Sequence, residues 1–432
     1  MKKSLATQRT TFCFPNFCFS FSCFLLFAFP ISAQEALRNS LAGDAAYEAA
    51  RLHPESMPYT VKSGDFRLLA TPSFGLDYND NVRLSKDNPE DDFILRPAVG
   101  LIASYPVTQR NLLQLNVTVG YDAYMNHSDL SRLDISSGSA LSFDIYIKDW
   151  LINLHDRFSY VQDSATEAAV ANTASYGSFQ NTAGLSGNWD LEDITVTLGY
   201  DHRNYLATSS QFEYTDNSSD NFLARAGLKL TPRLTAGLEA TAAPTTYDQH
   251  ILNDNVNYSL GAYADWKPGN ALHVQPRIGY TIFSMQQTSL VMPATDQNSW
   301  YADITVNHPI TESVSYSLSL GHELRLGVQS DTIDDTYARG NATWNLIRHY
   351  PLNTSLTYEH GTQGAGVNTQ GAGVNNIQAE NYDQFGVGLG VSHPITKRLT
   401  ASLNYRLTLR SSDIPNRDYT QNLVSILLSY HQ

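Results

Sequence analysis

The chain has 432 residues, with 28 Lys and Arg against 42 Asp and Glu, so its formal net charge is −14 at pH 7. This acidic balance argues against nucleic acid as a partner, because phosphate binding needs clustered basic side chains. No long apolar stretch follows Ala33, which excludes a helical membrane protein.

Residues 1–33 have the composition of a secretory signal peptide. Basic residues up to Arg9 precede a Phe-rich run from Phe12 to Pro30, and small residues follow up to Ala33. This order predicts export and cleavage after Ala33, and the prolines and serines in the run argue against the alternative of a retained membrane helix. All three cysteines lie in this leader, so the exported chain has no disulfides: Cys13, Cys18 and Cys23.

Residues 34–64 are expected to form a periplasmic N-terminal segment. Ala36–Leu52 carries a loose apolar face that is compatible with a short helix, and Pro54 and Pro58 follow it. A disordered linker is the alternative interpretation of this segment.

From Phe66 to Tyr430 apolar and polar residues alternate. In Leu113–Asp122 the odd positions are Leu, Val and Tyr, while the even positions are Gln, Asn, Thr, Gly and Asp, and the same scheme recurs in Ile194–Arg203 and Leu399–Arg410. A period of two over ten or more residues indicates β-strands, and helical spacing is absent.

Short corners punctuate this pattern about every 40 residues, a period that β-propellers share. Each repeat holds two strands of about 12–15 residues, which is long for a propeller blade and right for a tilted membrane crossing. The sequence His-Pro-Ile-Thr occurs at two of the corners, His308 and His393. The predicted corners are Tyr105-Pro106, Lys148-Asp149, Trp189-Asp190, Thr231-Pro232, Lys267-Pro268-Gly269, His308-Pro309, Tyr350-Pro351 and His393-Pro394.

Aromatic residues lie near both ends of the predicted strands. Trp150, Trp189 and Trp266 are beside short corners. Tyrosines on the apolar face lie toward the opposite strand ends, at positions 121, 200, 280, 358 and 405. Two belts are expected where rings sit at both lipid–water boundaries, although core aromatics of a soluble sandwich are the alternative.

The predicted fold class is all-β: a transmembrane antiparallel up-and-down β-barrel over residues 65–432, with short periplasmic turns and longer extracellular loops. The corners imply about 18 strands, an even number that leaves both ends of the barrel in the periplasm, and about 16 if the first pair lies outside the barrel. The first and last strand pairs are expected at Asp65–Tyr78, Asp92–Ser104, Lys397–Arg410 and Asp418–His431.

The segment "FGLDYNDNVRLS" (Phe74–Ser85) resembles the opening strand and loop of bacterial putative β-barrel porin families, some of which are associated with exopolysaccharide operons. The resemblance covers the barrel, from about Asp65 onward, through a short Tyr-x-Asp-Asn-Val-like motif followed by hairpins. It implies an outer-membrane channel, with a polysaccharide pathway as a further implication.

Sites for chemistry are not expected. "GHELR" at Gly321–Arg325 has one His of a zinc-protease motif but lacks the second, and it lies on a strand. The loop from Asp77 has acidic spacing similar to a calcium loop, but Val82 and Asn88 replace its Gly and Glu. We therefore predict no enzyme activity, no cofactor and no metal, with cation bridging to lipopolysaccharide as a minor alternative for this loop.

Charged residues on the polar face are the candidate functional site. Because a charged Arg or Lys facing mid-depth lipid costs about 2–4 kcal/mol, these residues should face the lumen. There they could line a pore and select solutes, or they could form ion pairs that brace the interior. Arg325 and Arg406 in particular are expected to meet water in the outer half. The candidates are Asp122, Arg157, Asp201, Arg203, Glu239, Arg277, Glu323, Arg325, Glu359, Arg406 and Arg410.

The leading functional prediction is an outer-membrane, porin-like channel of a Gram-negative bacterium that passes small hydrophilic solutes. The alternatives are a barrel in an exopolysaccharide export or biosynthesis system and, third, an outer-membrane hydrolase. Expected partners are outer-membrane lipid, lipopolysaccharide and the barrel assembly machinery. The sequence departs from the aromatic last residue that this machinery usually reads, because Tyr430 lies two residues before the end.

Overall fold

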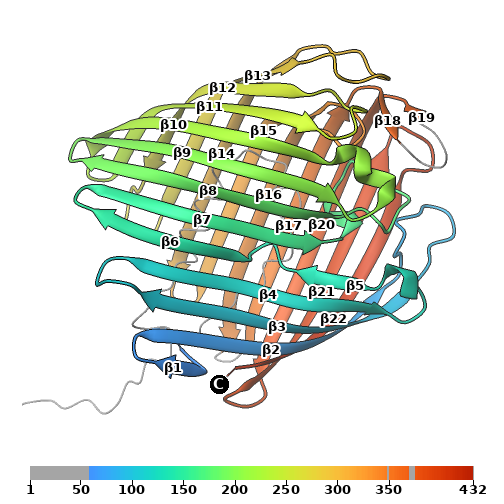
Figure 1. The fold of residues 1–432 in the computed structure, drawn as a ribbon. Coiled ribbons are helices and arrows are strands. Elements are labelled where there is room, and N and C mark those ends of the chain that lie inside the picture. Colours follow the sequence, from blue (N-terminus) through green and yellow to red (C-terminus); the bar gives the residue numbers. More distant parts are fainter. Residues whose placement is uncertain (1–57, 348–349, 369–374, 432) are drawn as a thin grey trace, which may run out of the picture.

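A computed structural model describes residues 58–347, 350–368 and 375–431. Within these ranges the chain forms a closed antiparallel β-barrel of 18 strands, as predicted. Successive positions in the barrel wall pair in chain order, and the barrel closes where the last strand meets the first (Figure 1). The predicted leader and Ala36–Leu52 lie outside the described residues.

The strands of the first half pair in simple up-and-down order because every one of them keeps the period-two pattern. They are β2 (Phe66–Asn79), β3 (Asp92–Pro106), β4 (Leu112–Tyr124), β5 (Arg132–Ile135), β6 (Ala140–Ile147), β7 (Trp150–Val161), β8 (Ser178–Leu191), β9 (Ile194–Ala207), β10 (Asn217–Thr231) and β11 (Leu234–Tyr247).

The second half continues in the same order and adds a small separate hairpin. Its strands are β12 (Asn255–Trp266), β13 (His273–Met285), β14 (Gln297–Thr311), β15 (Val314–Leu326), β16 (Thr332–Ile347), β17 (Tyr350–Gln363), β20 (Glu380–Pro394), β21 (Leu399–Ser412) and β22 (Tyr419–Tyr430). The hairpin is β18 (Gly366–Asn368) with β19 (Asn375–Ile377).

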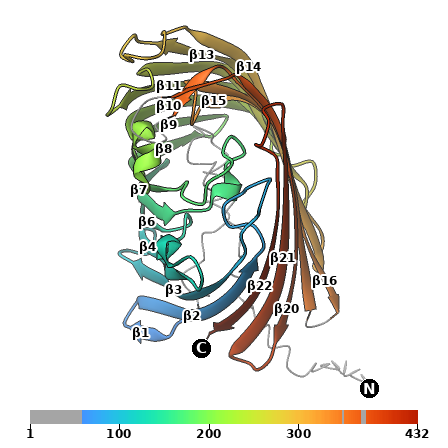
Figure 2. The ribbon, with the colours of Figure 1, turned by 90° about the vertical axis from the view of Figure 1, so that its right-hand side faces the viewer.

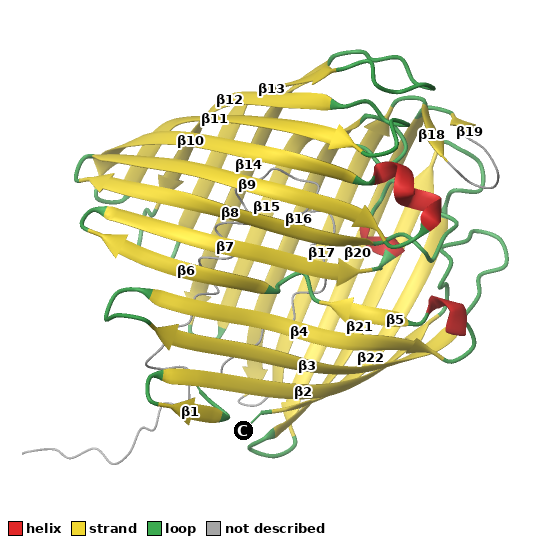
Figure 3. Cartoon of the chain, in the orientation of Figure 1, coloured by secondary structure: helices red, strands yellow, loops and turns green. Residues whose placement is uncertain are grey.

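Long loops gather at one end of the barrel and tight turns at the other (Figure 3). In the part of the chain that the structure describes, three short 3-10 helices occupy the loop end: η2 (Ser128–Leu130), η3 (Ser164–Thr166) and η4 (Ser210–Thr215). The described residues include no helix long and apolar enough to cross a membrane.

Two short strands share one position in the wall. β5 pairs with the outer part of β4 and β6 with its inner part, because Ser136–Ser139 interrupts the ladder between them. The sequence Ser-Ser-Gly-Ser provides no apolar side chain for the outer face there, which explains why the strand breaks at this point.

The predicted corner at His308-Pro309 is wrong. Both residues lie in β14, which continues to Thr311, and the turn comes at residues 312–313. A register shift directly after Pro309 accommodates a residue that has no backbone donor. At the second His-Pro-Ile-Thr site the prediction is close, since β20 ends at Pro394 and the turn begins at the next residue.

The seam of the barrel is shorter than most of the other strand joins. β22 pairs with β2 over Ser73–Asn79, so the beginning of β2 extends beyond it. A further strand, β1 (Val61–Ser63), pairs there with Phe66–Leu68. β1 falls at the end of the segment for which we expected a short helix or a linker.

The outer surface carries the expected apolar and aromatic residues. Trp150 and Trp189 stack beside the short turns, with ring centroids 5.0 Å apart. Toward the loop end, Tyr200 donates to Asp220 and Tyr358 donates to Asp383, at 2.8 Å in both cases. The rings therefore keep their apolar faces outward while their hydroxyls have polar partners.

Candidate functional site in the barrel lumen

Alternation along each strand separates an apolar outer face from a polar inner face. On β4, Val119 and Tyr121 are among the exposed large apolar side chains, whereas Asp122, on the inner face of the same strand, is buried. Glu239 on β11 is likewise buried, next to the outward Leu238, which is 64 % exposed. The charged side chains of these strands thus lie in the lumen.

The loop between β7 and β8, residues 162–177, folds into this lumen and crosses to the opposite wall (Figure 2). Arg410 Nε donates to the Ala168 carbonyl at 2.6 Å, and Arg417 donates to the Ala169 carbonyl at 2.7 Å. Ala168 and Ala169 are fully buried and pack with Ile333 and a tyrosine of the far wall. We refer to residues 162–177 as the inner loop.

Small residues allow the inner loop to pass through the barrel. Its middle reads Ala-Ala-Val-Ala, which offers carbonyls and small apolar side chains but little bulk. Asp163 caps η3 by accepting a hydrogen bond from the Ala165 amide at 3.2 Å, and Asn172 adopts a positive φ of 60° where the loop turns back. The sequence analysis did not find this loop, because it has no periodic pattern.

Other extracellular loops pack on the inner loop and narrow the outer mouth. A buried cluster joins Val170 and Tyr176 of the inner loop to Phe212 of η4, Tyr247 at the end of β11 and Val328 of the β15–β16 loop. On the other side, Ala171 packs with Leu84. These contacts form the apolar core of the molecule, which lies beneath the loops at the outer end.

Arg325 on β15 anchors the inner loop from the far wall. Its guanidinium contacts Glu167 of the loop at 3.0 Å, Glu359 at 3.1 Å and Asp335 at 3.3 Å. All four side chains are at most 7 % exposed. The expectation that Arg325 meets water is therefore wrong, because the inner loop covers it.

Arg406 on β21 also holds the inner loop, and it is more open. It pairs with Asp163 at 2.8 Å, and its side chain is 16 % exposed. Burial alone would raise the pKa of Asp163, but Arg406, followed by Arg96 and Arg132, outweighs it and holds the pKa of this loop carboxyl below its usual value. Asp163 is therefore an ionised anchor at neutral pH.

Glu380 on β20 joins two further arginines at the same wall. It contacts Arg410 and Arg417 at 2.7 and 2.8 Å, and these are the two arginines that hold the inner loop carbonyls. Backbone and side-chain contacts of the loop thus converge on one network.

The remaining wall carries a second network around Glu239. It accepts from Arg225 at 2.9 Å and from the Tyr301 hydroxyl at 3.0 Å. Arg277 lies 3.8 Å from Glu239 and pairs with Asp303 at 2.8 Å.

The other predicted site residues also have neighbours of opposite charge or polarity. Asp122 pairs with Arg96 at 3.2 Å and with Arg132 at 3.3 Å. His155 lies 2.7 Å from Asp201 and 3.3 Å from Arg157, while Arg203 is buried and 3.5 Å from the Asn217 side chain. Glu323 lies on β15, two residues before Arg325.

The structure therefore connects most of the predicted charges through ion pairs. Which of them contact a passing solute stays a prediction. Parity could have added Arg96 and Asp335, which lie on inward positions of their strands. Asp163 and Glu167 gave no signal in the sequence, since their role depends on where the inner loop lies.

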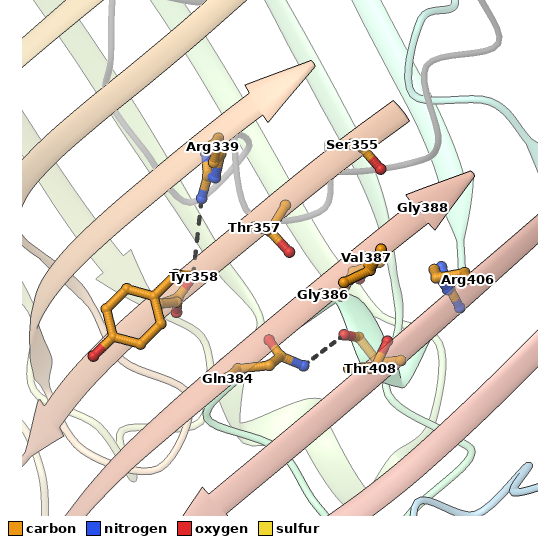
Figure 4. A pocket seen from close by; sticks show the side chains of 13 residues that line it. Arg339, Ser355, Thr357, Tyr358, Gln384, Gly386, Val387, Gly388, Arg406 and Thr408 are labelled. Atoms are coloured by element: carbon orange, nitrogen blue, oxygen red, sulfur yellow. Dashed lines mark hydrogen bonds and ion pairs between the residues drawn. The ribbon is translucent and has the colours of Figure 1, made fainter. Parts of the chain in front are cut away.

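A cavity remains in the lumen beneath the inner loop (Figure 4). It has a volume of about 670 Å³, counting the open space at its entrance, and lies against β16, β17, β20 and β21. Residues that line it include Arg339, Ser355, Thr357, Gln384, Gly386, Arg406 and Thr408. Among the described residues, no cluster of three or more His, Cys, Asp or Glu side chains could hold a metal ion.

A closed antiparallel barrel with an apolar outer face and a polar, charged interior defines the class of outer-membrane β-barrels of the porin type. The model of the family described as Putative beta-barrel porin 2 matches residues 54–264. This segment is similar to the putative β-barrel porin family, which confirms the resemblance seen in the sequence. No curated relative matches the chain.

The solved structures that match this chain include proteins of two bacteria. OccAB3 of Acinetobacter baumannii is 11% identical with a TM-score of 0.46, and the match covers 84% of this chain and 99% of that one. OccAB4 of the same organism is 12% identical with a TM-score of 0.45, covering 88% and 100%. OccK2 (OpdF) of Pseudomonas aeruginosa, solved with glucuronate, is 11% identical with a TM-score of 0.46, covering 85% and 98%.

Proposed function

We propose that the protein is an outer-membrane channel for the passive passage of small hydrophilic solutes. The observation that carries this proposal is the polar lumen, which retains an open cavity beneath the inner loop while the outer face is apolar. A polar interior in a barrel of this size is expected to hold water, and the inner loop restricts passage to small solutes.

Conductance in planar bilayers tests the proposal. Purified, folded full-length protein is expected to insert and give discrete current steps in salt, while the same preparation unfolded by heating gives none. Heat-modifiable migration on gels shows that the sample is folded. Folded protein that inserts without any ion current would contradict the channel function.

Pairing of the lumen charges leads us to propose weak ion selectivity. Arg277 is paired with Asp303, and Arg406 with Asp163, so neither arginine adds an uncompensated field. Under a salt gradient the reversal potential should therefore be close to zero, and Arg406→Glu should shift it toward cation preference.

The same proposal includes export by the leader, insertion by the barrel assembly machinery and contact with lipopolysaccharide. Cell fractionation and N-terminal sequencing of the exported protein test the location and the cleavage after Ala33. A role without enzyme activity or cofactors remains a prediction.

The exopolysaccharide alternative receives no support from the family description or from the similar structures. No specific contact among the described residues favours it or a hydrolase. Both stay predictions, and loss of polymer secretion on gene deletion would favour the former.

A further inference from the structure

The cavity beneath the inner loop is lined by hydrogen-bonding groups that lack protein partners. Thr408 on β21 is 5 % exposed, and its hydroxyl has no hydrogen-bond partner among the described residues. Ser355 and Thr357 on β17 line the same cavity, and their hydroxyls also have no such partner in the described part of the chain. Hydroxyls that face a cavity and have no protein partner are available to water or to a solute.

Gly386 on β20 keeps the space between these hydroxyls open. A Cβ at this position would lie 2.2 Å from Thr357 Oγ1, so any side chain there would enter the cavity. Figure 4 shows Gly386 and Gly388 on the strand between the one that carries Ser355 and Thr357 and the one that carries Thr408. The floor of the cavity is therefore bare backbone, and its edges carry hydroxyls.

Charge in this cavity is compensated. Arg406 pairs with Asp163 at 2.8 Å, and Arg339 lies 3.9 Å from Glu359. Gln384 donates a hydrogen bond to the Ala165 carbonyl at 2.9 Å, which fixes its amide. Because each lining cation already has a carboxylate neighbour, the cavity has little excess field with which to select an anion or a cation.

From this combination we propose that the cavity binds an uncharged polyhydroxylated solute, of the chemical class of a small neutral saccharide. Such a molecule offers a dense set of donors and acceptors to Ser355, Thr357 and Thr408 without requiring net charge in the wall. The inference rests on the proposed channel function, since it names the solute class for the same lumen.

Thr357→Val and Thr408→Val test the site with nearly isosteric changes. Each removes one hydroxyl and is expected to weaken binding of maltose, used as the neutral probe, by about 3- to 10-fold, which is typical for one hydrogen bond. Gluconate is the charged probe. Thr197→Val is the matched control, because Thr197 lies on β9 and its hydroxyl is already bonded to Asn188 at 2.6 Å.

Two measurements separate this inference from the channel function. Current block by maltose in planar bilayers reports binding in a conducting pore, and calorimetry of folded protein in detergent reports binding without any current. We expect maltose to bind more tightly than gluconate, with a loss in both cavity variants and none in Thr197→Val. Conduction without maltose binding, tighter gluconate binding, or unchanged affinity in both cavity variants would overturn the inference and leave the channel standing. Maltose binding without current would overturn the channel function alone.

Discussion

Replacing Arg325 with methionine should release the inner loop. The substitution leaves Glu167, Asp335 and Glu359 together without their shared cation in a site where these side chains are at most 7 % exposed. Removing one partner of a buried pair costs about 3–5 kcal/mol. Since Glu167 belongs to the loop, the repulsion is relieved when the loop leaves the wall.

The size of the effect follows from this cost. If about 3 kcal/mol goes into detaching the loop, the detached population rises by about 100-fold, because 1.4 kcal/mol corresponds to a factor of ten. Thermolysin can cut this loop only when it is detached, since Ala168–Val170 are at most 1 % exposed. The rate of cleavage within residues 162–177 is therefore expected to rise by about the same factor.

Mass spectrometry of the fragments after timed proteolysis measures this rate. Arg277→Met is the matched control: it also removes a lumen arginine from two carboxylates, Asp303 and Glu239, neither of which lies in the inner loop. Cleavage of the loop should stay slow in this variant. Equal protection of the loop in Arg325→Met and in the unmodified protein would refute the anchoring role of Arg325.

Three further predictions concern pH, the outer face and backbone contacts. Asp92, and more weakly Glu90, raises the pKa of His127 in the β4–β5 loop. Protonated His127 therefore stabilises the loop fully below the unfolded pKa of about 6.5, and this stabilisation is lost as pH rises through the higher folded pKa. The unfolding midpoint of His127→Asn should therefore depend less on pH across this range. Leu260→Arg, at an outward position that is 65 % exposed, should cost about 2–4 kcal/mol in urea unfolding from lipid vesicles, whereas the same change at the neighbouring inward Ser259 should cost clearly less. Gly237→Val should lower the thermal midpoint strongly, since its Cβ would lie 2.0 Å from the Ala226 carbonyl oxygen, while Gly269→Val, with nothing within 4 Å, should not.

The alternation of apolar and polar residues was sufficient to predict the barrel, because the sequence of each strand shows which residues face outward and which face inward. The first strand was expected at Asp65–Tyr78 and lies at Phe66–Asn79, since the period of two identifies a strand without knowledge of its neighbours. The strand ends were predicted less well. Pro309 indicated a corner, but the register shift after it lets the ladder continue to Thr311.

The alternation along each strand could predict which charged side chains point inward, but not which of them contact one another. Arg325 and Glu359 were both expected in the lumen, and their contact depends on the pairing of three successive strands. Glu167 lies 158 residues from Arg325, in a loop without any periodic signal. Such a contact is decided by closure of the whole barrel, which a local pattern cannot encode.

The short seam has a consequence for self-association. Because β22 reaches β2 only over Ser73–Asn79, the first residues of β2 would present free backbone donors and acceptors at the rim. β1 occupies this position through Phe66–Leu68, and Thr60 extends the cover by donating its amide to the Leu68 carbonyl at 2.7 Å and accepting from the Ala70 amide at 3.0 Å. β1 and Thr60 thereby cover the backbone edge at the beginning of β2. A second barrel cannot add a strand at this edge, because β1 already pairs with it.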